Sequence, residues 1–76
     1  NFSLKKSIKE VRNVYFGYNN YGWKKTNIYD RNKLPINKNI KGPAIVEEMS
    51  STTLILPNHN FKIDKFGNLI INILNG

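Results

Sequence analysis

The sequence has no cysteine, so two kinds of site are excluded from the start. No disulfide can cross-link the fold, and no thiolate can bind a metal ion. Long apolar runs are missing as well: the longest, residues 69–74, is interrupted by Asn72 and falls far short of the roughly 20 residues of a membrane-spanning helix. The absence of cysteine fits a reducing, cytoplasmic location. The first residues lead into polar sequence rather than an apolar core, so we expect no signal peptide.

Groups suited to catalysis are scarce. The single histidine, His59, stands in a Pro-Asn-His-Asn turn, where a lone histidine is usually a solvated surface residue. The glycines are isolated from one another, so the sequence has no glycine-rich phosphate loop. The hydroxyl side chains of residues 50–53 have no adjacent base that would activate a nucleophile. We therefore expect no catalytic residue, no metal ligand and no cofactor bound by this chain alone.

Two of the carboxylates, Glu47 and Glu48, are adjacent in a predicted strand. Neighbouring strand residues point to opposite faces, so these two cannot act together as an acid–base pair. One of them faces the core side of the sheet, where an ionised carboxylate needs a partner such as Arg12, Arg31 or a lysine. The favoured interpretation is a structural ion pair. The alternative is a carboxylate that faces a neighbouring catalytic domain.

The chain carries a net charge of +7, from 12 lysines and arginines against 5 acidic residues. A clustered basic face would attract the phosphates of a nucleic acid. Here the lysines are spread along the chain, and only those at positions 5–6 and 24–25 are adjacent. Asparagine, isoleucine and lysine are the commonest residues, which is typical of an AT-rich genome and accounts for much of the charge. A free-standing basic β-barrel that binds nucleic acid is therefore the alternative hypothesis, not the favoured one.

Aromatic residues are concentrated in one segment, at Tyr15, Tyr18, Tyr21 and Trp23. Such a group can stack the bases of a single-stranded nucleic acid. More often these residues fill the edge of a small β core or dock against another domain, because their rings supply large buried areas. We favour docking, since a domain that belongs to a larger protein exposes apolar surface of this kind.

Apolar and polar residues alternate with a period of two through most of the chain, and β-branched and aromatic residues are frequent. This pattern predicts short strands at residues 11–16, 23–29, 44–49, 52–56, 61–63 and 69–74. Strands of this length predict a mainly β fold, a small barrel or sandwich of about six, mostly antiparallel strands. Residues 1–10 are expected to be an N-terminal tail or short helix, and residues 11–76 the β domain.

Several turns carry their own chemical signals. Asp30 is placed to cap the backbone N–H groups of the turn that follows it. Pro43 cannot donate to a strand ladder, so it belongs at the start of a strand. Asn58 tolerates a left-handed conformation in the turn 57–60, and Gly67 supplies the positive φ of a bulged hairpin over residues 64–68.

Four stretches, in this order, resemble one family: Arg-Asn-Val-Tyr-Phe at 12–16, Thr-Asn-Ile-Tyr-Asp-Arg at 26–31 with Leu34, Gly-Pro-Ala-Ile-Val-Glu-Glu at 42–48 with Ser-Thr-Thr at 51–53, and Ile-Asp-x-x-Gly-Asn-Leu at 63–69. They are similar to the C-terminal regions of the hydantoinase A / 5-oxoprolinase family, over about residues 12–71. The turn at residues 56–60 departs from that pattern, since relatives usually carry a Pro-Pro-Gly type of turn there.

The resemblance implies a role in a larger enzyme. Members of this family, which include N-methylhydantoinases, 5-oxoprolinases and acetone and acetophenone carboxylases, use ATP to activate a carbonyl or amide oxygen. Their ATPase body lies upstream, and a hydantoinase B-type subunit or half works beside it. This chain would then be a C-terminal accessory domain of an ATP-dependent cyclic-amide hydrolase. It would pack on the ATPase body or the partner subunit, with ATP and Mg bound elsewhere, no membrane contact and no nucleic acid.

The polar residues inside the family motifs are the best candidates for a structural or interface role. Arg31 is expected to form a buried or interfacial ion pair, with Glu47 as the suggested partner, and Thr52 to hydrogen-bond nearby. A place along the substrate passage is the alternative for this group. With the two aromatic residues expected to dock, the candidates are Asp30, Arg31, Glu47, Thr52, Tyr15 and Trp23; no catalytic or metal residue is among them.

Overall fold

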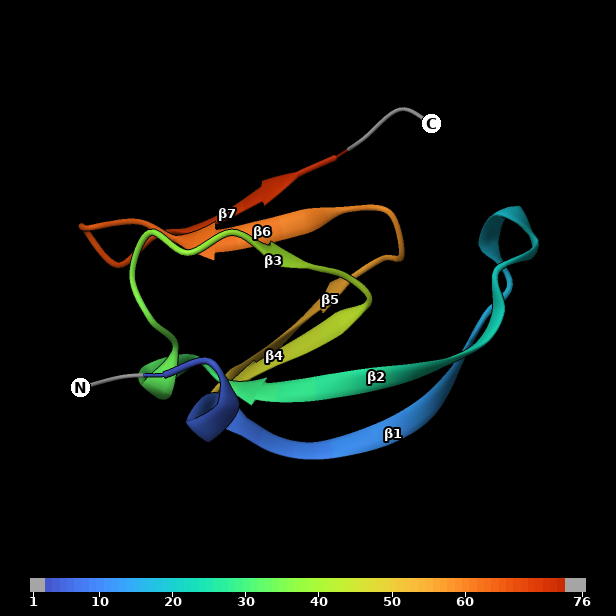
Figure 1. Cartoon of the computed structure of the whole chain (residues 1–76), viewed down its shortest axis with the longest axis horizontal. Coiled ribbons are helices and arrows are strands. Elements are labelled where there is room, and N and C mark those ends of the chain that lie inside the picture. Colours follow the sequence, from blue (N-terminus) through green and yellow to red (C-terminus); the bar gives the residue numbers. More distant parts are fainter. Residues whose placement is uncertain (1–2, 74–76) are drawn as a thin grey trace.

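The computed structural model of the chain describes residues 3–73, without the side chain of Tyr18, and shows two small β-sheets that pack over one core (Figure 1). The strands are β1 (Ile8–Phe16), β2 (Gly22–Asp30), β3 (Ile40–Lys41), β4 (Ala44–Glu48), β5 (Ser51–Ile55), β6 (Asn60–Ile63) and β7 (Leu69–Asn72). Of three short 3₁₀ turns, η1 (Lys5–Ser7) precedes β1, η2 (Tyr18–Asn20) joins β1 to β2, and η3 (Arg31–Lys33) follows β2. None of the helical segments in this part of the chain is long and apolar enough to cross a membrane.

The first sheet has the order β1-β2-β4-β5, and the second has the order β3-β6-β7. All strand pairs are antiparallel except β2 and β4, which run parallel. The predicted mainly β, mostly antiparallel fold is therefore confirmed. Of the two architectures expected, the sandwich is found: over residues 3–73 the strands form two separate sheets and do not close into a barrel.

Several strand boundaries differ from those expected, most of them by one residue. Strand β1 begins at Ile8 rather than at residue 11, and its register against β2 shifts between Ile8 and Glu10. Strand β3 was not expected, because two residues are too short for an alternating pattern to be visible. It forms because Ile40 is buried and pairs with Phe61 of β6. The predicted last strand extends to residue 74, which lies outside the described part, and β7 ends at Asn72.

The core lies between the two sheets. Its buried side chains come from both, and the rings of Tyr29 and Phe61 meet there edge to face with centroids 5.9 Å apart. On β4 the inward residues Ala44 and Val46 alternate with partly exposed neighbours, as the period of two predicts. The buried cluster is Tyr29, Leu34, Ile40, Ala44, Val46, Ile55, Phe61 and Ile63.

The entrance to β4 depends on a glycine. The N–H of Gly42 donates to the carbonyl oxygen of His59 at 2.8 Å, so two loops touch backbone to backbone. A Cβ at position 42 would lie only 2.3 Å from the carbonyl oxygen of Leu56. Glycine is therefore required here by close approach, and Pro43 follows at the mouth of the strand, as predicted.

The predicted turns are also confirmed. The Asp30 carboxylate accepts from the N–H of Asn32 at 3.0 Å and caps η3. In the β6–β7 hairpin, Gly67 has φ +85°, and the N–H of Asp64 donates to the carbonyl oxygen of Asn68 at 2.9 Å. Asn58 adopts the left-handed conformation with φ +73°.

Candidate functional site

A polar depression of about 480 Å³ opens to solvent where β2 and β4 end. Strands β2 and β4 are parallel, so their carboxyl ends meet at the same edge, and Asp30 lies directly beside Glu47 in the register. Three of the six predicted site residues, Asp30, Glu47 and Thr52, line this depression. Its other lining residues are Lys9, Asn32, Glu48 and Met49.

Glu47 forms an ion pair with a lysine from β1, a strand that does not adjoin β4 in the sheet. The ammonium Nζ of Lys9 on β1 donates to Oε1 of Glu47 on β4 at 2.8 Å, across the end of β2. The register of β1 against β2 shifts at this point, so Lys9 is an extra residue with no register partner in β2. This allows its side chain to extend across the end of β2 to Glu47. The hydrogen bond to Glu47, followed by the charge of that carboxylate, raises the pKa of Lys9 above its usual range.

Arg31 connects the two sheets. Its Nη1 donates to Oε1 of Glu48 at 3.1 Å, and its Nη2 donates to the carbonyl oxygen of Gly67 at 2.7 Å. The hydroxyl of Ser51 donates to the same Glu48 oxygen at 3.0 Å. Arg31 therefore forms an ion pair, but with the two side chains 25% and 36% exposed the pair is not buried within this chain.

The suggested partner of Arg31, Glu47, was wrong. Asp30 and Glu47 are register partners and share one side of the sheet. Glu48 follows Glu47 on β4 and therefore points to the other side of the sheet. Arg31, the first residue of η3 just beyond the end of β2, meets it there. The expectation that one of the adjacent carboxylates has a basic partner on the core side holds for Glu48, although its side chain remains 36% exposed.

Thr52 stands opposite Glu47 in the β4–β5 ladder and is exposed at the rim. Within residues 3–73 no hydrogen bond of its hydroxyl is found, so the structure gives no support for the expected one. Across the same residues, no three histidine, aspartate or glutamate side chains gather in a way that could hold a metal ion. The arrangement is a set of solvent-exposed ion pairs, whose contribution to stability is small individually.

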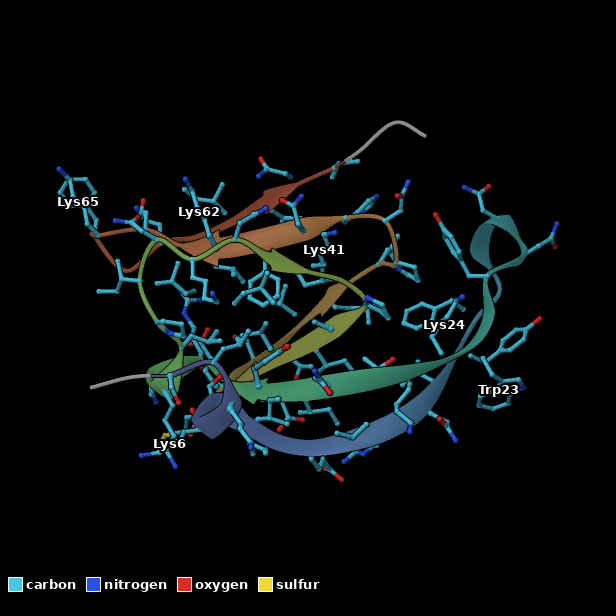
Figure 2. The ribbon with its side chains drawn as sticks, in the orientation of Figure 1. Lys6, Trp23, Lys24, Lys41, Lys62 and Lys65 are labelled. Carbon is cyan, nitrogen blue, oxygen red and sulfur yellow. The ribbon has the colours of Figure 1, made fainter. Side chains whose placement is uncertain are left out.

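The two predicted aromatic residues lie elsewhere, at the far end of the β1–β2 hairpin: Tyr15 is near the end of β1 and Trp23 near the start of β2. Tyr15 and Trp23 are register partners, and their rings meet edge to face with centroids 5.4 Å apart. Both remain open to solvent, with 60% and 70% of their surface exposed. Figure 2 shows Trp23 pointing away from the two sheets. The six candidates thus divide into a polar group at one end of β2 and an aromatic pair at the other.

Two residues of the depression carried no usable signal in the sequence. Lys9 lies in the segment expected to be a tail, and only the register shift of β1 brings it to Glu47. Met49 is fully exposed in the β4–β5 turn. The sequence prediction places it inside the strand 44–49, whereas β4 ends at Glu48.

The lysines that are labelled in Figure 2 lie on different parts of the molecule. Figure 2 shows Lys24 on the hairpin, Lys41, Lys62 and Lys65 around the second sheet, and Lys6 near the opposite end of the first sheet. A protein that tracks a phosphate backbone normally collects its basic side chains on one face. This spread favours the docking interpretation of the aromatic pair over base stacking.

Comparisons with known proteins agree with the resemblance seen in the motifs. A family model described as the hydantoinase/oxoprolinase C-terminal domain matches residues 3–72. An uncharacterized protein of Methanocaldococcus jannaschii is 43% identical over 63 residues, which cover 83% of this chain and 9% of the relative. The chain therefore spans less than a tenth of the length of that relative. No solved structure matches.

Proposed function

This chain belongs to the hydantoinase/oxoprolinase C-terminal domain family, and on that premise we propose that it is the accessory, interface-forming domain of an ATP-dependent amidohydrolase. In this role it packs on the ATPase body or on a hydantoinase B-type partner in the cytoplasm. ATP and magnesium are bound by the body, and the substrate is a cyclic amide of the hydantoin or oxoproline type.

The observation that carries this proposal is the exposed aromatic pair. Val11, Tyr15 and Trp23 share one face of the β1–β2 hairpin, and about half or more of the surface of each is exposed. Tyrosine and tryptophan are the residue types that most often dominate the binding energy of protein interfaces. The exposed aromatic pair at the end of an extended hairpin is therefore well suited to bury against a larger body.

The polar group at the other end of β2 serves this surface indirectly. Arg31 joins the first sheet to the β6–β7 turn, and Lys9 joins β1 to β4. The Arg31 link holds the base of the hairpin in a fixed orientation relative to the second sheet, and the Lys9 link ties the strands of the first sheet together at the same end. In this proposal Asp30, Arg31 and Glu47 are structural rather than catalytic residues.

The test uses the archaeal relative as the body. The relative is produced without the segment that matches this chain, and binding of the chain in trans is measured by calorimetry. The double variant Tyr15→Ala, Trp23→Ala is expected to weaken binding at least about tenfold, since one hot-spot aromatic typically contributes about 2 kcal/mol or more. Met49→Ala, which also removes an exposed apolar side chain, is the matched control and should bind as the unsubstituted chain does.

Failure to bind the body in any form would overturn the proposal. The net charge of +7 makes single-stranded nucleic acid the second candidate. Titration with oligo-dT decides between them: binding whose logarithm falls linearly with the logarithm of salt concentration would support the nucleic-acid function.

A further inference from the structure

The four outer strands of the two sheets differ in how their free edges are protected. Edge strands usually carry charges or are very short, because an open edge pairs readily with other chains. Strand β1 carries Lys9, Glu10 and Arg12, and β3 is only two residues long and includes Lys41. Strand β5 presents three hydroxyl residues, Ser51–Thr53. Only β7, with the sequence Leu-Ile-Ile-Asn, is both uncharged and largely apolar.

The backbone of β7 is ready to accept another strand. In the hairpin, the N–H of Asp64 donates to Asn68, so the hydrogen-bonded pairs of the ladder continue at Lys62 and Ile70. The intervening residues, Leu69 and Ile71, therefore direct their N–H and C=O groups away from β6. In the described part of the chain β7 has β6 as its one ladder neighbour, so these groups face the open edge.

The side chains of β7 are exposed on both faces. Ile70 is 37% exposed on the outer face and Ile71 39% on the core-facing side, where the first sheet does not cover it. Ile73, just beyond the strand, is 68% exposed. An added strand would therefore find apolar contacts on both of its faces as well as backbone partners.

The charges around β7 determine the chemistry of that strand. Lys62 is the ladder partner of Ile70, on the outer face, and Lys65 lies in the turn that leads into β7. Figure 2 shows Lys41, Lys62 and Lys65 around this sheet. The nearby carboxylate, Asp64, accepts hydrogen bonds from the N–H groups of Phe66 and Asn68 in its own turn. A complementary strand therefore carries acidic side chains, whereas a second copy of this chain, also at +7, is repelled.

We infer that β7 is an acceptor edge for an extended strand of the enzyme body, with acidic residues on its outer face and apolar residues on its inner face. The assignment of this strand to the enzyme body rests on the proposed function. The edge of β7 is a different surface from the one formed by Tyr15 and Trp23. The domain then holds the body at two places, by an aromatic contact on the hairpin and by sheet extension at β7.

The first experiment uses a capped peptide of alternating glutamate and valine, with a lysine–valine peptide as the matched control. Amide hydrogen exchange in the chain is followed by NMR. At a peptide concentration ten times its Kd, exchange of the Leu69 and Ile71 amides should slow roughly tenfold, because only the free fraction exchanges. The Ile70 amide, already bonded to Lys62, should change less. No protection at these two amides, equal protection by the lysine peptide, or protection at β1 or β5 would overturn the inference.

The variant Ile71→Pro removes one outward N–H while leaving the bonds to β6 intact, a position at which strands tolerate proline. Glutamate–valine peptide binding should be lost while the NMR spectrum stays that of a folded chain. If the variant does not fold, a peptide N-methylated along one edge gives the same test, since it should no longer bind to the unsubstituted chain. Unchanged binding in either experiment contradicts the inference.

The body of the archaeal relative separates the two proposals. If it binds the unsubstituted chain and Ile71→Pro equally well, the β7 inference fails and the proposed function stands. If it binds neither, the proposed function fails, and with it the source assigned to the strand. A dimer in sedimentation that Ile71→Pro abolishes would show that a second copy occupies β7, which also overturns the inference.

Discussion

The guanidinium of Arg31 lies 3.1 Å from the carboxylate of Glu48, and the same side chain reaches the carbonyl oxygen of Gly67 with its second nitrogen. Glu48 ends β4 in the first sheet, and Gly67 belongs to the turn between β6 and β7 in the second. One side chain thus ties the sheets together at the end of the sandwich. A planar fork with several donors is needed for this, which an ammonium group cannot reproduce.

Replacing Arg31 with alanine should lower the free energy of unfolding by about 1–2 kcal/mol, from one partly exposed ion pair and one hydrogen bond to a carbonyl group. Arg31→Lys should recover only part of this loss. Urea unfolding followed by circular dichroism measures the change. Lys33→Ala, in the same turn but exposed, is the control, with an expected change within about 0.5 kcal/mol. Equal effects of the two alanine variants would show that the bonds from the Arg31 guanidinium to Glu48 and Gly67 contribute nothing to the free energy of unfolding.

Gly42→Ala should be strongly destabilising. The new Cβ would meet the carbonyl oxygen of Leu56 at 2.3 Å, and backbone atoms cannot move aside as a flexible side chain can. Overpacking of this kind typically costs about 1–3 kcal/mol, and we expect the upper part of that range. At Gly17 the nearest atom to a new Cβ is a ring carbon of Tyr15 at 3.4 Å, so Gly17→Ala should be nearly neutral. Thermal unfolding of both variants tests the contrast.

Two phenylalanines offer a matched pair for the core. Phe61 is fully buried between the sheets, whereas Phe66 is 77% exposed in the hairpin turn. Phe61→Ala should cost about 3–5 kcal/mol, enough to unfold much of a chain this short at room temperature. Phe66→Ala should change the unfolding midpoint little. Retention of a cooperative transition at the original midpoint in Phe61→Ala would contradict the described core.

Asp64 should make stability depend on pH on the acid side. The backbone N–H of Asn68, at 2.8 Å, is the main cause that lowers the pKa of this carboxyl, with the N–H of Phe66 adding to it. Because the folded pKa is the lower one, the stabilisation is present above the unfolded value of about 3.9 and is lost as the pH falls through the folded pKa.

The Asp64→Asn variant lacks this titration. Its free energy of unfolding should be lower than that of the unsubstituted chain at neutral pH, and the difference should shrink as the pH falls below about 4. Urea unfolding across this range, compared between the two chains, isolates Asp64 from the other carboxylates. A difference that stays constant with pH would mean that the ionised form is not the one stabilised.

Much of this protein follows from its sequence alone. The alternation of apolar residues predicts six of the seven strands, because a pleated, half-buried strand imposes a period of two wherever it lies. The turns at Asp30 and Gly67 are equally local, since a capping carboxylate and a positive φ act over a few residues. The ordered motifs that include Gly42 and Pro43 identify the family, which the match over residues 3–72 confirms.

Tertiary structure alone decides which residues meet. Arg31 pairs with Glu48 rather than Glu47, and Lys9 reaches Glu47 across β2, because a parallel pairing and a register shift set those positions. The open edge of β7 likewise depends on the order of strands in its sheet. Local periodicity determines which face of a strand is apolar, but not which strand lies beside it. That choice depends on burying the whole core at once, so contacts between distant segments appear only in the folded chain.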